Sequence, residues 1–115
     1  MKAEFNVLLV EQFEGSPDHQ NLTSGNIYRV ISLEADGIRV MNDYGEPGLY
    51  PDSWFSITDP QWPTDWVVTI GTEGERYASP QVLSDNYFWE RYFDGDKEAT
   101  QILQKRLRQW DQYED

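Results

Sequence analysis

The stretch IYRVISLEADGIRVM, residues 27–41, decides how the first half of this chain folds. Residues 27–33 are rich in β-branched and aromatic side chains, and both faces of the predicted strand are largely apolar. Asp36-Gly37 separates this strand from a second one at Ile38–Met41, and Asp-Gly between apolar runs is a strong hairpin signal. A strand that is apolar on both faces needs cover on both, so we expect a further layer of structure on its outer face.

The residues on either side extend this hairpin into a small β-rich unit. The other elements expected before residue 60 are a strand at Phe5–Val10, a polar loop at residues 11–24, a turn at Asn42–Gly45, a strand at Leu49-Tyr50, a helical turn at Asp52–Phe55 and a closing strand at Ser56–Thr58. Five short strands in so short a segment are typical of a small closed β-barrel.

The second half of the chain predicts a β-hairpin followed by two helices. Strands are expected at Trp66–Ile70 and Glu75–Ala78, after a stiff connector that contains two prolines. A short helix follows Asp85, and a longer one runs from Lys97 to about Trp110. The longer helix has an apolar stripe made of Ala99, Ile102, Leu103, Leu107 and Trp110. We expect both helices to pack on the barrel, so that residues 5–59 and 60–115 form one structural unit.

Three short motifs in the first half follow a known pattern. They are LTSGNIYRV at residues 22–30, NDYGE at residues 42–46 and GLYPDSWF at residues 48–55. Over about residues 7–59 the chain resembles small bacterial SH3-like barrel proteins of unassigned function. The resemblance implies an α+β protein with an SH3-like five-stranded small β-barrel, followed here by a β-hairpin and two C-terminal α-helices packed on it.

The resemblance also implies a role for Pro51 and Trp54, because these positions of the family motif help to line a groove for Pro-rich peptides. Two differences from the family argue against that peptide pocket in this chain. The tyrosines of the first family motif are missing near Val7–Gln12, and Gly37-Ile38 stands where the family has paired tryptophans. A fold alone does not assign a function, so the site is predicted from its own residues.

The binding site that we predict is an acidic, aromatic surface formed by Tyr44, Glu46, Tyr50, Pro51 and Trp54. Such a surface suits a basic, partly apolar segment, with cation–π contacts of about 0.5–2 kcal/mol each. The alternative is that these aromatic side chains belong to the core or lie under the C-terminal half of the chain.

The charge of the chain favours a basic partner. Its 115 residues include 21 acidic and 9 basic ones, for a net charge of −12, and residues 1–96 carry this whole excess. A protein or peptide with a basic surface is therefore the expected partner, and nucleic acid is not. The alternative is that the charge only keeps the protein in solution. Lys105, Arg106 and Arg108 are expected to offset the helix dipole and pair with the acidic barrel, the alternative being contact with an external acidic surface.

The sequence contains no motif for catalysis, a cofactor or a metal ion. There is no cysteine, the single histidine is His19 in a polar loop, and the aspartates do not follow the calcium-loop spacing. No apolar run is long enough to span a membrane. We therefore expect a non-enzymatic, cytoplasmic protein-interaction module, with a monomer favoured. Two alternatives stay open: an acidic inhibitor or immunity-type protein that blocks a basic toxin or nuclease, and a small ligand-binding protein or enzyme that uses carboxylates with Trp62 and Trp66.

Overall fold

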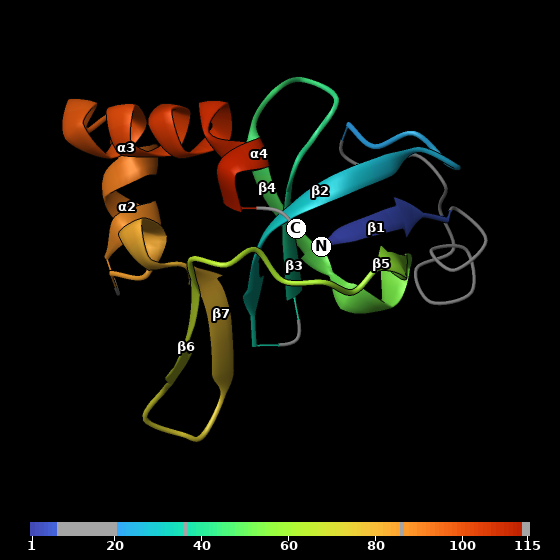
Figure 1. The fold of residues 1–115 in the computed structure, drawn as a ribbon, viewed down its shortest axis with the longest axis horizontal. Helices are drawn as coiled ribbons and strands as arrows, with labels where there is room; N and C mark the ends of the chain where they lie inside the picture. Colours follow the sequence, from blue (N-terminus) through green and yellow to red (C-terminus); the bar gives the residue numbers. More distant parts are fainter. Residues whose placement is uncertain (7–20, 36, 86, 114–115) are drawn as a thin grey trace.

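The computed structural model describes residues 1–6, 21–35, 37–85 and 87–113, which form a mixed α+β protein (Figure 1). Its elements in chain order are β1 (Lys2–Phe5), β2 (Ile27–Glu34), β3 (Gly37–Met41), β4 (Pro47–Pro51), η1 (Asp52–Trp54), β5 (Phe55–Asp59), β6 (Trp66–Ile70), β7 (Arg76–Pro80), η2 (Gln81–Leu83), α2 (Phe88–Phe93), α3 (Lys97–Arg108) and α4 (Trp110–Tyr113). The seven strands of the described residues form one antiparallel sheet, so the predicted α+β class is confirmed.

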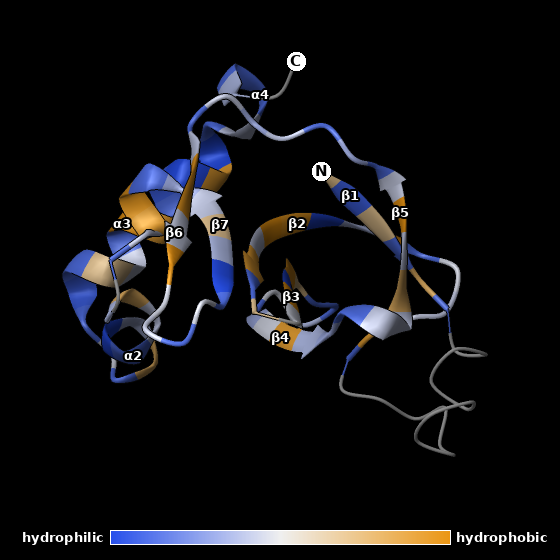
Figure 2. Ribbon diagram, turned by 90° about the horizontal axis from the view of Figure 1, so that it is seen from below, coloured by the Kyte–Doolittle hydropathy of each residue, from blue (hydrophilic) through white to orange (hydrophobic). Residues whose placement is uncertain are grey.

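Strand β2 pairs with three other strands, and so it connects the five N-terminal strands to the β6–β7 hairpin. Its first residues pair with β1. Its later residues lie between β3, with Val30 opposite Val40, and β7, with Leu33 opposite Ala78. The helices and the β6–β7 hairpin lie on one side of β2, and β1 and β5 lie on the other (Figures 1 and 2).

Two clusters of buried side chains occupy the opposite faces of β2. Val30 belongs to the cluster that also contains Phe5, Tyr50 and Trp54. Its neighbour Ile31 belongs to the other cluster, with Leu83, Phe88, Ala99 and Leu103. Successive side chains of a strand point to opposite faces, so the helices supply the cover that the doubly apolar strand needs. This cover reaches only the second half of β2, because Ile27 is 56% exposed.

The five N-terminal strands do not close into a barrel, which corrects the sequence prediction. Their order is β4-β3-β2-β1-β5, and among the described residues the end strands β4 and β5 do not pair with each other. Strand β4 has proline at both ends, at Pro47 and Pro51, and proline cannot donate a ladder hydrogen bond. The outer edge of β4 therefore lacks donors that closure would need.

The hairpins β3–β4 and β6–β7 turn with the same geometry. In the first, Asn42 N–H donates to Glu46 O at 2.9 Å, and Gly45 adopts a φ of 75°. In the second, Gly71 N–H donates to Glu75 O at 2.8 Å, and Gly74 adopts a φ of 83°. Glycine is favoured at both positions because a positive φ strains other residues. Hydrogen-bonded and non-hydrogen-bonded residue pairs alternate along an antiparallel ladder. The hydrogen bond at each turn therefore determines which strand residues direct their N–H and C=O groups to the outer edge of the hairpin.

The helical part differs from the prediction in one respect, because three helices are found among the described residues instead of two. Helix α3 begins after Asp96, whose side chain accepts a hydrogen bond from Ala99 N–H at 3.2 Å. The predicted stripe faces the core, with Ala99 and Leu103 buried. The helix ends at Arg108, and Trp110 begins the separate helix α4 instead of extending α3.

Arg106 fixes α3 to the connector between β5 and β6. It is 2% exposed, and its Nε and Nη2 atoms donate to the Asp65 carboxylate at 2.7 and 2.8 Å. Its guanidinium carbon also lies 4.9 Å from the centroid of the Trp110 ring and 4.5 Å from that of Tyr113. The predicted pairing with an acid of this chain is therefore found for Arg106, and the acid lies in the connector. Lys105 and Arg108 are exposed.

Several predicted features fall outside the described residues. They are residues Val7–Val10 of the predicted first strand, the loop residues 11–20 with His19, and Asp36 of the first hairpin turn. The described part of that strand differs from the prediction, because β1 runs from Lys2 to Phe5 and ends before Asn6. The region near Val7–Gln12, where the family tyrosines are missing, also lies outside them.

Candidate functional site

The structure separates the five residues of the predicted binding surface into exposed and buried ones. Tyr44 lies in the β3–β4 turn and is 74% exposed, and Glu46 and Pro51 are exposed as well. Tyr50 and Trp54 are only 4% and 5% exposed, and their ring centroids are 6.0 Å apart inside the first core cluster. Tyr50 is buried between the exposed residues Leu49 and Pro51 of β4, and Trp54 is the buried residue of η1. The exposed part of this surface is therefore Tyr44, Glu46 and Pro51.

The acid beside Tyr44 stabilises the β3–β4 turn. Asp43 accepts hydrogen bonds from Tyr28 OH at 2.7 Å and from Thr23 Oγ1 at 2.6 Å. Burial, with smaller contributions from Asp43, raises the pKa of Tyr28 above its ordinary value. Burial likewise raises the pKa of Tyr50, whose hydroxyl oxygen accepts a hydrogen bond from Asn42 Nδ2 at 3.2 Å. Both tyrosine hydroxyls thus form hydrogen bonds that stabilise the structure near this turn.

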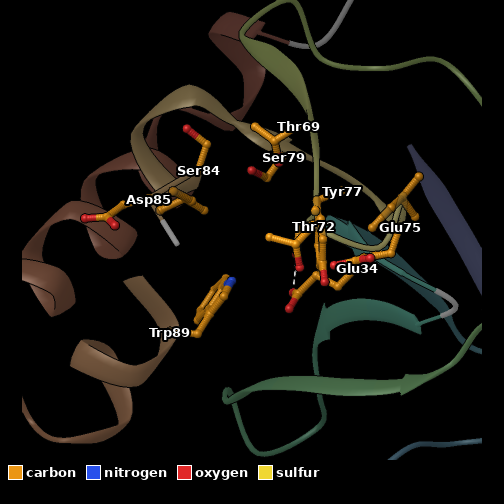
Figure 3. Close-up of a pocket in the computed structure, with 13 residues that line it drawn as sticks. Glu34, Thr69, Thr72, Glu75, Tyr77, Ser79, Ser84, Asp85 and Trp89 are labelled. Carbon is orange, nitrogen blue, oxygen red and sulfur yellow. Dashed lines mark hydrogen bonds between the residues drawn. The ribbon is translucent and has the colours of Figure 1, made fainter. Parts of the chain in front are cut away.

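A cavity of about 340 Å³ lies between the β6–β7 hairpin and the helical part of the molecule (Figure 3). We call it the hairpin cleft. Its walls come from β2, from β6, β7 and the turn between them, from η2 and from α2. The lining residues are Ser32, Leu33, Glu34, Thr69, Gly71, Thr72, Glu75, Tyr77, Ser79, Leu83, Ser84, Asp85 and Trp89. They include three acids and no lysine or arginine, so the hairpin cleft suits a cationic group.

Of the three acids, Glu34 has the closest pairing with a cation. It accepts hydrogen bonds from Ser32 Oγ at 2.6 Å and from Arg39 Nη2 at 2.9 Å, and Arg39 Nε donates to it as well. Arg39 is almost completely buried, and its guanidinium carbon lies 4.2 Å from the centroid of the Trp89 ring. Glu34, Arg39 and Trp89 therefore form one unit that joins β2, β3 and α2 and forms part of the wall of the hairpin cleft.

The other two acids lie at opposite ends of the lining. Glu75 accepts a hydrogen bond from Glu73 N–H at 3.1 Å in the β6–β7 turn. Asp85 accepts one from Tyr87 N–H at 3.0 Å before α2, and its other carboxylate oxygen lies 3.7 Å from Arg91 Nη1. Because neither acid is paired as closely with a cation as Glu34, these two carboxylates are the ones that an external cation can approach.

A second, shallower cavity of about 360 Å³ lies beside β4 and η1. Its lining residues are Glu34, Gly37, Leu49, Tyr50, Pro51, Asp52 and Ser53. It therefore contains two residues of the predicted surface, Tyr50 and Pro51. Glu34 borders both cavities.

The sequence did not reveal the hairpin cleft because its lining combines residues 32–34 with residues between 69 and 89, two segments that are distant in the chain. One signal was present, since Arg39 stands between Ile38 and Val40 in a strand where all three side chains are buried. A buried arginine requires an acid close by. The two tryptophans of the ligand-binding alternative lie elsewhere: Trp62 and Trp66 have ring centroids 5.6 Å apart and line neither cavity.

The described part of the chain holds no group of three or more His, Cys, Asp or Glu side chains placed to bind a metal ion. No helix in the same residues combines the length and the apolar character that crossing a membrane requires. Comparison of the whole chain with protein-family models, with curated proteins and with solved structures yields no match.

Proposed function

We propose that this protein is a non-enzymatic protein-interaction module that binds a basic segment of another protein at the hairpin cleft. The observation that carries this proposal is the lining of the cleft: among the described residues it has no basic side chain, and its acids Glu75 and Asp85 are not closely paired with a cation. The net charge of −12 supports the same partner, because it attracts basic proteins over a distance of about 10 Å at 0.1 M salt.

We also infer that the fold is related to SH3-like barrels. This inference is supported by the strand order β4-β3-β2-β1-β5 and by the 3-10 turn between β4 and β5. We assign the main binding site to the hairpin cleft and not to the predicted aromatic surface, because Tyr50 and Trp54 are buried. The exposed part of the predicted surface, formed by Tyr44, Glu46 and Pro51, is the competing surface. Separate variants of this surface and of the cleft distinguish the two sites.

The test is capture of proteins from a lysate of the source cells on immobilised protein, at about 0.05 M and about 0.5 M salt. Two double variants remove the same number of charges. The cleft variant is Glu75→Gln with Asp85→Asn, and the control is Glu46→Gln on the competing surface with Asp52→Asn at the exposed residue that follows Pro51. We expect capture of basic proteins that weakens with salt, is reduced by the cleft variant and is retained by the control. Equal loss in both variants, or capture that salt does not change, contradicts the proposal.

An acidic inhibitor of a basic enzyme is the second candidate, and the uniform sign of the cleft lining favours it as well. It differs from a general interaction module in having one partner with an activity. If the captured protein is a nuclease or toxin, addition of this protein at equal concentration should abolish its activity, and the cleft variant should not.

A further inference from the structure

Strand β6 has an open edge. Among the described strands it pairs only with β7, which itself lies between β6 and β2. In Figure 1 the β6–β7 hairpin extends away from the rest of the sheet, with β6 on its outer side. A strand in this position presents backbone donors and acceptors that another strand can use.

The register shows which groups of β6 point outward. Arg76 O accepts a hydrogen bond from Ala35 N–H, at the end of β2, so the backbone of Arg76 faces β2 and turns away from β6. Ile70 lies opposite Arg76, and Val68 lies opposite Ala78, two residues further along. Both are non-hydrogen-bonded pairs of the β6–β7 ladder, so the N–H and C=O groups of Val68 and Ile70 point to the open edge.

The side chains of β6 do not protect this edge. Val68 and Ile70 are 52% and 61% exposed, and apolar segments are visible along the β6 ribbon in Figure 2. Proteins commonly block edge strands with proline or a charged side chain, and Trp66–Ile70 contains neither. The outer edge of β4 has this protection, because Pro47 and Pro51 stand at outward-facing positions. Strand β5, the remaining end strand of the described sheet, contains the charged residue Asp59. Strand β6 is therefore the one end strand among the described residues that has neither proline nor a charged side chain.

Charge identifies the partner of this edge. Residues 59–80, which include the whole β6–β7 hairpin, contain four acids, Asp59, Asp65, Glu73 and Glu75, and one basic residue, Arg76. A second copy of this chain would bring the same acids, and a net charge of −12, against them. A basic segment is attracted by the same charges.

We propose that the edge of β6 binds an extended segment of a partner protein as an additional antiparallel strand, with apolar and basic residues alternating along that segment. The apolar residues pack beside Val68 and Ile70. The basic residues lie on the other face, beside Thr69, which lines the hairpin cleft with Glu75. This inference rests on the proposed function and specifies how the partner is held.

The probe is a heptapeptide of alternating lysine and valine with blocked ends. We expect saturable binding that shifts the NMR amide signals of Val68 and Ile70 and slows their hydrogen exchange. The valines opposite these residues must donate hydrogen bonds from their own nitrogens. A peptide methylated on its valine nitrogens should therefore bind at least about tenfold more weakly, whereas one methylated on its lysine nitrogens keeps its affinity. Equal affinity of the two methylated peptides overturns the proposal, and so does a failure of the unmodified peptide to bind.

A protein variant gives a second test. Val68→Pro removes an outward N–H that the β6–β7 ladder does not use, so the hairpin is retained while peptide affinity falls about tenfold or more. Val68→Ile is the matched control and binds as the wild type does. If Val68→Pro does not fold, the methylated peptides decide the question with the unchanged protein.

Different results overturn the strand pairing at β6 and the proposed function at the hairpin cleft. Peptide binding that survives Val68→Pro and is lost in the cleft variant overturns the strand pairing and leaves the proposed function standing. Self-association at about 0.5 M salt that Val68→Pro abolishes assigns the edge to a second copy of this chain and overturns the choice of a basic partner.

Discussion

The guanidinium carbon of Arg39 lies 4.2 Å from the centroid of the Trp89 ring, while the same guanidinium holds the Glu34 carboxylate. Arg39 comes from the sheet and Trp89 from α2, so this contact attaches the helical part of the molecule to the strands. Trp89 also packs against the core cluster around Ile31 and faces the hairpin cleft. The stability of the fold and the shape of the cleft therefore depend on the same side chains.

Trp89→Leu should lower the free energy of unfolding by about 1–3 kcal/mol, measured by urea denaturation. The loss combines a cation–π contact of about 0.5–2 kcal/mol with reduced packing against the second core cluster. Trp89→Phe keeps an aromatic ring and should cost less. In a double-mutant cycle with Arg39→Met the two changes should be coupled, and additive effects would show that the Arg39–Trp89 contact contributes nothing to stability.

Asp65→Ala should destabilise the protein by about 3–5 kcal/mol, because it leaves the buried Arg106 guanidinium without its carboxylate. The matched control is Asp111→Ala, which removes an exposed pair with Arg29 at 3.5 Å and should cost about 0–1 kcal/mol. Both values follow from chemical denaturation at neutral pH. Similar costs for the two variants would mean that burial of Arg106 is not what makes the first pair important.

Stability should fall as the pH rises above 10, because Tyr28 and Tyr50 have raised pKa values in the folded protein. Below pH 10 both tyrosines are protonated in the folded and the unfolded chain, so their contribution is complete. Above it the unfolded chain ionises first, and the contribution is lost as the pH rises through the folded pKa. The melting temperature measured from neutral to alkaline pH should fall less steeply in Tyr50→Phe. An unchanged slope would exclude Tyr50 as a source of the alkaline loss.

Asp96→Asn should lower stability at neutral pH, with the difference from the wild type disappearing in acid. The hydrogen bond from Ala99 N–H, together with the Arg91 guanidinium, lowers the pKa of Asp96 in the folded protein. Its contribution is therefore present above the pKa of the unfolded chain and is lost as the pH falls through the folded value. Melting temperatures of both proteins across the acidic range test this, and a constant difference at every pH would contradict it.

Local patterns in the sequence predicted most of the strands, the helices near Phe88–Phe93 and Lys97–Arg108, and the two-sided burial of β2. The two apolar faces of residues 27–33 required cover, and the stripe on Lys97–Arg108 was the apolar surface able to supply it. Gly45 and Gly74 marked the hairpin turns because only a residue that tolerates positive φ suits those positions. These features depend on residues close together in the chain, and the sequence displays such relationships directly.

Only the tertiary structure decided which aromatic side chains are buried and where the candidate site lies. The same motif that predicts η1 does not say on which side of the sheet Tyr50 and Trp54 lie, and both are buried. The hairpin cleft and the Arg39–Trp89 contact each join segments that are distant in the chain, and the edge of β6 is open because no other described strand packs beside it. Their existence depends on how the sheet and helices pack, because periodicity determines which face of an element is apolar but not which other element will cover it.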